Sequence, residues 1–232
     1  MTILSSMAAL LPLLGAVSAE SPASSAGADT ADTLAGEGQT ALTRFTESVT
    51  TYEAQFTQVD YTATGDVRQR QAGSVVVQRP GQFRWIYATP FEQQLIADGT
   101  NLWSYDVDLD SVSVRGQEET LARSPADILA GTVDALTYFD FQGAFERDEV
   151  LWVQLGSRDS EADFTALRLG FREDVLVGME LANRLQQRTE IVFREVRTNQ
   201  PVDASLFEFL PPVGIDVEGV PLPVAPGGSG EP

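Results

Sequence analysis

The sequence contains no cysteine, no histidine and no lysine, so all 15 of its basic residues are arginines. These absences remove most of the side chains on which enzymes rely. Without them the chain cannot form a Ser-His-Asp triad, a Cys-His pair, a Ser-Lys dyad, a Schiff base or a zinc site of the imidazole and thiolate kind. The composition therefore favours a binding protein over an enzyme, and we expect no catalytic residues, no metal and no cofactor.

Positive charge as a whole is scarce. The chain has 34 acidic residues, a net charge of -19 and an isoelectric point near 4.2. Nucleic acids and anionic lipid surfaces attract basic patches, so we expect neither as a partner. The acidity is better explained as a contribution to solubility.

The N-terminus has the pattern of an export signal. The apolar run "MAALLPLLGAV" (7–17) leads into the small residues "VSA" (17–19), which suit cleavage before Glu20. A bilayer span needs roughly 20 apolar residues, so this run is too short to be one. We therefore expect residues 1–19 to be a cleaved signal peptide. Since the chain has no cysteine, an acylated N-terminal cysteine cannot anchor the exported protein.

Two segments of small and polar residues flank the central part of the chain. Their composition predicts a flexible leader over 20–36 and a disordered tail over 218–232. The residues between them, 37–217, show no internal linker and no convincing repeat. Their length is compatible with one β-rich domain.

Helical periodicity occurs in two places. In the first, large apolar residues recur at spacings of 3 and 4, namely Leu42, Phe45, Val49, Tyr52 and Phe56. Alternation begins near Tyr52, so we expect that helix to give way to a strand there. The second place is "SPADILAG" (124–131), where Ser124 is a plausible N-cap and Gly131 a stop.

Nearly all of the remaining central sequence alternates as strands do, and we count about 11 of them in antiparallel order. A barrel of about eight strands is the size that its own side chains fill. A larger sheet must split, enclose a helix or leave a cavity. Because both predicted helices are amphipathic, they suit a lid over an opening better than a buried plug.

The stretch from Gln78 to Asp106 is apolar on both faces. By strand alternation Phe83, Trp85 and Tyr87 share one face, and Ile86 lies on the other. Both faces must therefore be covered, one by ordinary packing and the other by the lid or by something bound in the cavity.

Several motifs, taken in order, resemble the LolA family of periplasmic outer-membrane lipoprotein carriers. They are "FTQ" (56–58), "GSVVVQRPGQFRW" (73–85), Pro90, "LIADGTNLWSYD" (95–106), "SPADILAG" and "LFEFLPPVGIDV" (206–217). The resemblance implies a mainly β fold: an incomplete, half-open antiparallel β-barrel of about 11 strands, with a small α-helical lid over a hydrophobic cavity that takes acyl chains.

The same resemblance implies a function. Members of the family act as monomers in the periplasm, receive acylated lipoproteins from an inner-membrane ABC transporter, and pass them to a lipid-anchored outer-membrane lipoprotein acceptor. That acceptor needs a lipidated cysteine, so the absence of cysteine favours the carrier. A periplasmic lipid-binding or lipoprotein-sensing domain of the same fold remains an alternative.

The acidic residues invite two other interpretations. A paired-carboxylate enzyme would draw on Asp106, Asp108, Glu118 and Glu119, although any chain with 34 acidic residues contains such pairs by chance. A calcium loop starting at Asp106 would need glycine at position 111 and glutamate at position 117, where the sequence has Ser111 and Gln117. We therefore favour an acidic hairpin loop.

Arg79 is the sharpest candidate for a functional residue. The matching arginine of the family hydrogen-bonds main-chain groups of the lid, which implies carbonyl partners near Leu129 and Ala130. A solvated charge at a strand end is the alternative. The remaining candidates for the cavity or the lid are large and apolar: Phe83, Trp85, Leu95, Trp103, Ile128 and Leu129.

Overall fold

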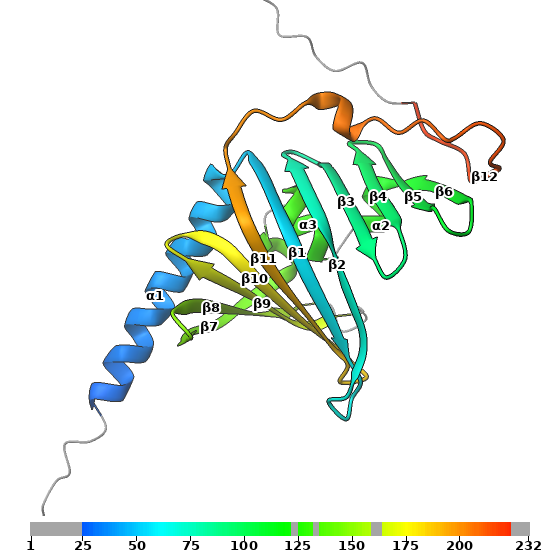
Figure 1. Cartoon of the computed structure of the whole chain (residues 1–232). Helices are drawn as coiled ribbons and strands as arrows, with labels where there is room; N and C mark the ends of the chain where they lie inside the picture. Colours follow the sequence, from blue (N-terminus) through cyan, green and yellow to red (C-terminus); the bar gives the residue numbers. More distant parts are fainter. Residues whose placement is uncertain (1–24, 122–124, 132–134, 159–163, 224–232) are drawn as a thin grey trace, which may run out of the picture.

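One strongly curved sheet dominates the computed structural model, which describes residues 25–121, 125–131, 135–158 and 164–223 (Figure 1). The predicted signal peptide and the predicted N-cap Ser124 lie outside the described residues. The strand order is β12-β6-β5-β4-β3-β2-β1-β11-β10-β9-β8-β7. The strands are β1 (Thr51–Tyr61), β2 (Val67–Gln78), β3 (Gln82–Thr89), β4 (Gln93–Asp98), β5 (Asn101–Asp106), β6 (Ser111–Gly116), β7 (Phe139–Arg147), β8 (Val150–Ser157), β9 (Phe164–Arg172), β10 (Val175–Asn183), β11 (Arg188–Thr198) and β12 (Val217–Glu218).

The sheet is an open barrel, as predicted. Its eleven longer strands pair in antiparallel fashion, and its two edges, at β12 and β7, do not join. After β6 the chain crosses from one side of the sheet to β7 at the far edge through three short helices. The helical segment therefore spans the region where a closed barrel would have its seam.

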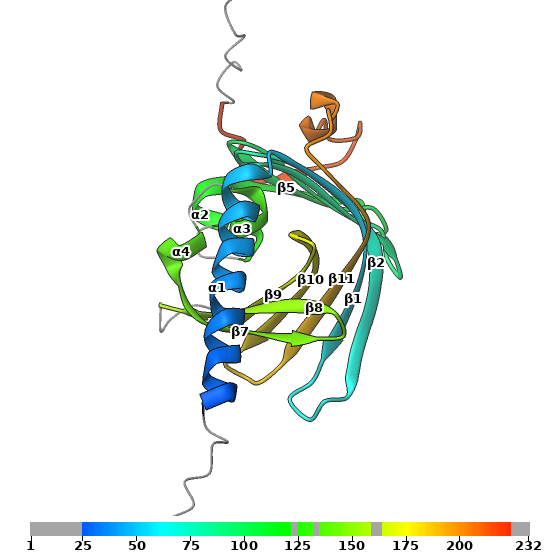
Figure 2. The ribbon, with the colours of Figure 1, turned by 90° about the vertical axis from the view of Figure 1, so that its left-hand side faces the viewer.

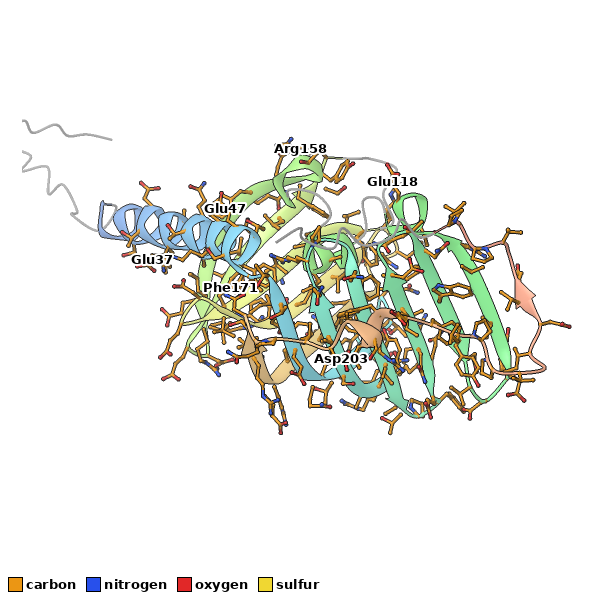
Figure 3. The ribbon with its side chains drawn as sticks, turned by 90° about the horizontal axis from the view of Figure 1, so that it is seen from above. Glu37, Glu47, Glu118, Arg158, Phe171 and Asp203 are labelled. Carbon is orange, nitrogen blue, oxygen red and sulfur yellow. The ribbon has the colours of Figure 1, made fainter. Side chains whose placement is uncertain are left out.

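The helices lie on the concave side of the sheet (Figure 2). They are α1 (Ser25–Ser48), α2 (Gln117–Leu121), α3 (Pro125–Ala130) and α4 (Ala135–Tyr138). One face of α1 is buried at Gly38, Ala41, Leu42 and Phe45, the spacing that an amphipathic helix requires. In Figure 3, Phe171 of the sheet lies beside α1, on which Glu37 and Glu47 are exposed.

Both ends of the domain carry more structure than the sequence suggested. Helix α1 begins at Ser25, so residues 25–36 of the expected flexible leader are helical. Alanine has the highest helix propensity and recurs in this stretch at positions 26, 28, 31 and 35. At the other end, β12 pairs in parallel with β6, and Asn101 exchanges hydrogen bonds of 2.7 and 3.0 Å with the backbone of Leu222. The start of the expected tail is therefore held against the sheet, at β6 by Glu218 and at β5 by Leu222.

The two faces of the sheet have separate apolar cores. The concave core packs beneath the helices and includes Phe45, Phe56 and Trp85. The convex core consists of Ile96, Trp103, Val112 and Val114, covered by Phe209, Ile215 and Val217 of the C-terminal segment. That segment starts with the short 3-10 helix η1 (Ala204–Phe207), which is capped by Asp203 (Figure 3). Both apolar faces of the 78–106 stretch are thus covered by protein.

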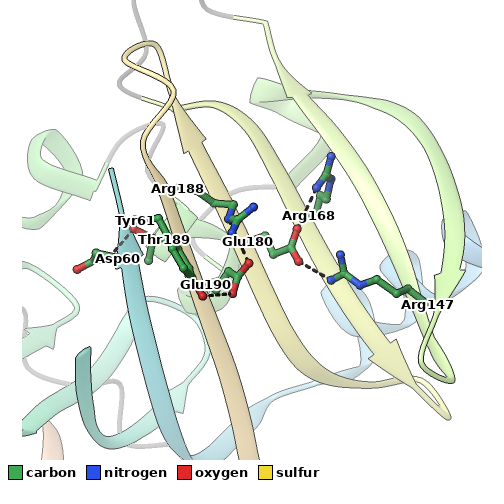
Figure 4. A network of polar contacts seen from close by, with 8 residues as sticks. All are labelled: Asp60, Tyr61, Arg147, Arg168, Glu180, Arg188, Thr189 and Glu190. Atoms are coloured by element: carbon green, nitrogen blue, oxygen red, sulfur yellow. Dashed lines mark hydrogen bonds and ion pairs between the residues drawn. The ribbon is translucent and has the colours of Figure 1, made fainter. Parts of the chain in front are cut away.

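The convex face of β7–β10 carries an ion-pair network around Glu180 (Figure 4). Glu180 is 6% exposed, and its carboxylate accepts hydrogen bonds from Arg147 and Arg168. The Arg147 guanidinium also lies 4.6 Å from the Trp152 ring centre. Burial alone would raise the pKa of Glu180, but the hydrogen bonds and charges of the two arginines outweigh burial and lower it.

Within the described part of the chain, no helix combines the length and the apolar character that crossing a membrane requires.

Candidate functional site

Arg79 lies directly after β2 and joins two helical segments through backbone carbonyls. Its NH1 donates to the carbonyls of Phe45 (2.6 Å), Thr46 (3.2 Å) and Val49 (3.2 Å), at the end of α1 and just beyond it. Its NH2 and Nε donate to the carbonyls of Ile128 (2.9 Å) and Leu129 (3.0 Å) in α3. The contact with Leu129 is the one expected from the sequence, whereas the Ala130 carbonyl accepts from the Gly81 N–H at 2.9 Å.

The chemistry of this contact follows from the ends of the helices. The last carbonyls of a helix have no intrahelical partner and carry partial negative charge. One guanidinium satisfies several of them at once, because its donors form a planar fork. Arg79 also lies over the Phe45 ring, 4.5 Å from its centre. Burial lowers the pKa of Arg79 from 12.5 to about 10, so it remains charged at neutral pH.

A second set of polar contacts lies near Arg79, between α2 and the turns at Gly81 and Gly99, and was not identified from the sequence. Gln117, 3% exposed at the start of α2, donates through Nε2 to the Gly81 carbonyl at 2.6 Å. Its Oε1 accepts from the Gly99 N–H at 3.0 Å. No sequence pattern marks this glutamine, because its partners are backbone groups of two distant turns.

The apolar candidates mostly meet beneath the helices. Phe83, Trp85, Ile128 and Leu129 belong to the concave core, with exposed fractions of 5%, 9%, 2% and 4%, and Leu95 is half-buried against them. Aromatic rings fill the space around Trp85, with the Phe56 ring centre 4.7 Å away. The described side chains of the helices and the sheet therefore pack against one another where the sequence predicts the cavity.

Trp103 is an exception, and its prediction as a cavity or lid residue is wrong. It pairs with Ile96 and Val114 across the sheet and lies in the convex core, 5.3 Å from the Phe209 ring centre. Strand alternation explains the difference. Its neighbour Leu102 pairs with Ala97 and packs against the concave core instead.

Two hollows lined by described residues lie at the margins of the concave core. One, of about 530 Å³, lies beside α1 and is bordered by charged residues including Asp32, Glu37 and Glu173. The other, of about 150 Å³, lies at the β1–β2 end of the sheet and is bordered by Asp60 and Arg188. Apolar residues of the core also line them, including Phe171 in the larger hollow and Leu181 in the smaller one.

The structure places the acidic residues Asp106 and Asp108 far from Glu118. Asp106 and Asp108 lie at the turn of the β5–β6 hairpin, while Glu118 lies in α2, beyond the opposite end of that hairpin. Six-residue strands span roughly 20 Å, which is too far for two carboxylates to act on one bond. Among the described residues, no group of three or more acidic side chains is arranged to hold a metal ion.

Comparison with known proteins agrees with the family resemblance seen in the sequence. The sequence profile of the family described as "Outer membrane lipoprotein carrier protein LolA" matches residues 47–210. An outer-membrane lipoprotein carrier protein of Methylococcus capsulatus is 36% identical over 77% of this chain and 86% of its own length. One from Halorhodospira halophila is 39% identical over 76% of this chain and 83% of its own length.

Proposed function

Because the chain belongs to the LolA family of outer-membrane lipoprotein carrier proteins, we propose that it holds the acyl chains of its cargo between the concave face of the sheet and helices α1 and α3. The protein is a lipoprotein carrier, and the candidates Phe83, Trp85, Leu95, Ile128 and Leu129 would contact the chains. Arg79 would latch the two helical segments in the empty state.

The proposed route begins with export through the signal peptide at residues 1–19. In the periplasm the carrier receives acylated lipoproteins from an inner-membrane ABC transporter and passes them to a lipidated outer-membrane acceptor. The absence of cysteine supports the role of carrier rather than acceptor, since this chain cannot itself be lipidated at cysteine. The composition supports a binding role without catalysis.

The physical problem for such a carrier is to cover the chains and then to release them. Exposing each methylene to water costs about 0.8 kcal/mol, so several long chains would cost on the order of tens of kcal/mol. An apolar lining removes that cost without specific strong contacts. Release needs a favourable empty state, and the hydrogen bonds of Arg79 to both helical segments would stabilise one.

The observation that carries the proposal is the set of five carbonyl hydrogen bonds by which Arg79 joins α1 and α3 above the aromatic concave core. The test is to purify the protein from the periplasm of its own cells and to identify bound molecules by mass spectrometry. We expect acylated lipoprotein. Free lipid alone would favour the lipid-binding alternative, and the absence of any lipidic molecule would contradict the proposal.

A further inference from the structure

The concave face changes from apolar to polar along β1 and β2, with distance from Arg79. Next to Arg79, Tyr52 pairs with Val77, and the next pair on this face is Ala54 and Val75. Beyond Phe56 the pairing residues become Gln58 and Gln71, followed by Asp60. This polar end lies at the β1–β2 turn, away from α3 (Figure 1). An amphiphile lying along these strands would therefore meet an apolar surface at one end and a polar surface at the other.

Trp85 lies just inside that boundary and has a donor without an acceptor. Its indole Nε1 is buried, and no described atom accepts a hydrogen bond from it. The Tyr87 hydroxyl is near enough to be polarised by this N–H, but the geometry is not that of a hydrogen bond. The Trp85 N–H is therefore a buried donor without an acceptor in the described structure. A buried donor of this kind destabilises the empty state, and a bound acceptor relieves it.

Further donors continue from Trp85 towards the polar end. The Tyr87 hydroxyl donates weakly to Gln58 Oε1 at 3.4 Å, and Gln58 Nε2 donates to Gln71 Oε1 at 3.1 Å. The amide nitrogen of Gln71 has no acceptor among the described residues. Asp60 accepts from the Thr189 hydroxyl at 2.7 Å beside the 150 Å³ hollow (Figure 4). Besides the Trp85 indole, the boundary thus offers the Gln71 amide as a donor.

We propose that this boundary is a carbonyl-binding site, at which the Trp85 indole N–H and the Gln71 amide hold the ester or amide carbonyls that join acyl chains to the lipoprotein. The inference rests on the proposed function. Every acyl chain ends in a carbonyl whose oxygen accepts hydrogen bonds but does not donate them. The hydrocarbon tails then point along β1–β3 towards Arg79, and the protein part of the cargo leaves at the β1–β2 end. Trp85 in this role sets the depth and direction of the bound chains.

Trp152 provides a matched control for Trp85. Its indole Nε1 is also buried without an acceptor, but it lies on the convex face against Gly170 and Gly178. Trp85→Phe and Trp152→Phe therefore each remove one unsatisfied N–H and keep an aromatic ring. They differ in which face of the sheet loses the donor.

The experiment measures binding of two synthetic diacyl-type lipopeptides to the full mature chain. One carries ester-linked chains, and the other carries ether-linked chains of the same length, which lack the carbonyl oxygens. We expect the parent protein and Trp152→Phe to bind the ester probe about tenfold more tightly, as one satisfied hydrogen bond allows. We expect a clearly smaller ester preference in Trp85→Phe, which keeps only the Gln71 amide as a donor. An ester preference as large in Trp85→Phe as in the parent, or no preference in the parent, would overturn the carbonyl site.

A second measurement needs no substitution. The indole N–H resonance of Trp85 should shift downfield when the ester probe binds and shift less with the ether probe, while that of Trp152 stays in place. Equal shifts of the Trp85 resonance with both probes would overturn the inference. If the parent protein bound neither probe, the proposed function itself would be overturned, and this inference with it.

Discussion

Arg79 donates a hydrogen bond through Nε to the carbonyl oxygen of Leu129, 50 positions further along the chain, at 3.0 Å. The contact joins the end of a strand to the last turn of α3. The same guanidinium reaches the carbonyls at the end of α1. One side chain therefore connects both helical segments above the concave core, and its removal should affect the movement of helices more than the stability of the sheet.

Arg79→Leu should give a folded protein that loads lipoprotein but releases it poorly. Charge-assisted hydrogen bonds contribute about 1.5–3 kcal/mol each, so losing several of them weakens the closed, empty state. Because the closed, empty state is then less favourable, the open, filled state persists. The measurement is transfer of a radiolabelled lipoprotein from the purified carrier to acceptor-containing membranes. Arg70→Leu is the control, since Arg70 is an exposed arginine of β2, the strand that ends just before Arg79. Transfer by Arg79→Leu at the parent's rate would restore the alternative of a solvated strand-end charge.

Gly131→Ala should disturb the hydrogen bonds of Arg79 by a change next to α3 instead of a change in Arg79 itself. Gly131 follows α3 with φ of +62°, and an added Cβ would lie 2.5 Å from Cδ and 2.7 Å from Nε of Arg79. Gly65→Ala is the matched control, since Gly65 has φ of +89° and no atom within 4 Å of the added Cβ. Both variants carry the backbone strain of a left-handed conformation, about 1 kcal/mol. Only Gly131→Ala should speed hydrogen exchange of the Gly81 amide, and equal exchange in the two variants would contradict the steric argument.

Glu180→Gln should lower stability at pH 7 and have less effect in acid. The folded-state pKa of Glu180 lies below its ordinary value of 4.5. Its contribution to stability is therefore full above the unfolded pKa and is lost as the pH falls through the folded pKa. We expect a loss of about 1–2 kcal/mol at pH 7, because the partner arginines are half exposed and solvent screens the pair.

Urea denaturation of the parent and Glu180→Gln at several pH values measures this difference. Glu53→Gln is the control, because its ion pair with Arg197 is longer, at 3.7 Å, and exposed. If the loss in free energy of unfolding caused by Glu180→Gln grew as the pH fell towards 3, the lowered pKa of Glu180 would be contradicted.

Phe209→Ala should destabilise the protein without weakening lipoprotein binding. Phe209 covers Trp103 on the convex face and is half-buried. We therefore expect the free energy of unfolding to fall by about 2 kcal/mol, less than for a fully buried phenylalanine. The Trp103 fluorescence should shift to the red as its cover is lost. If lipoprotein binding fell while stability was unchanged, the convex core would belong to the cargo site after all.

The local sequence patterns explain which parts of this account were predictable. Alternation and Gly-containing turns locate the eleven longer strands, whereas the contact of Arg79 with Leu129 was implied by the resemblance to the family. Trp103 was misplaced because both faces of its strand are apolar, and the segment that covers it lies about a hundred residues further along the sequence. The pairing of β12 with β6 and the contacts of Gln117 were missed for a related reason. They depend on backbone groups brought together by the fold, which leave no periodic pattern in the sequence.

The most direct test of the central claim is photocrosslinking from two adjacent positions of β4. Leu95 and Gln94 are both half-buried, but Leu95 faces the concave core, while Gln94 faces the convex side, where it accepts a hydrogen bond from Arg84. A photoreactive residue at each position is exposed to an acylated lipoprotein and to the same protein without its acyl chains. The account predicts a crosslink from position 95 only, and only to the acylated form. Equal crosslinking from positions 94 and 95, or crosslinking that does not depend on acylation, would contradict it.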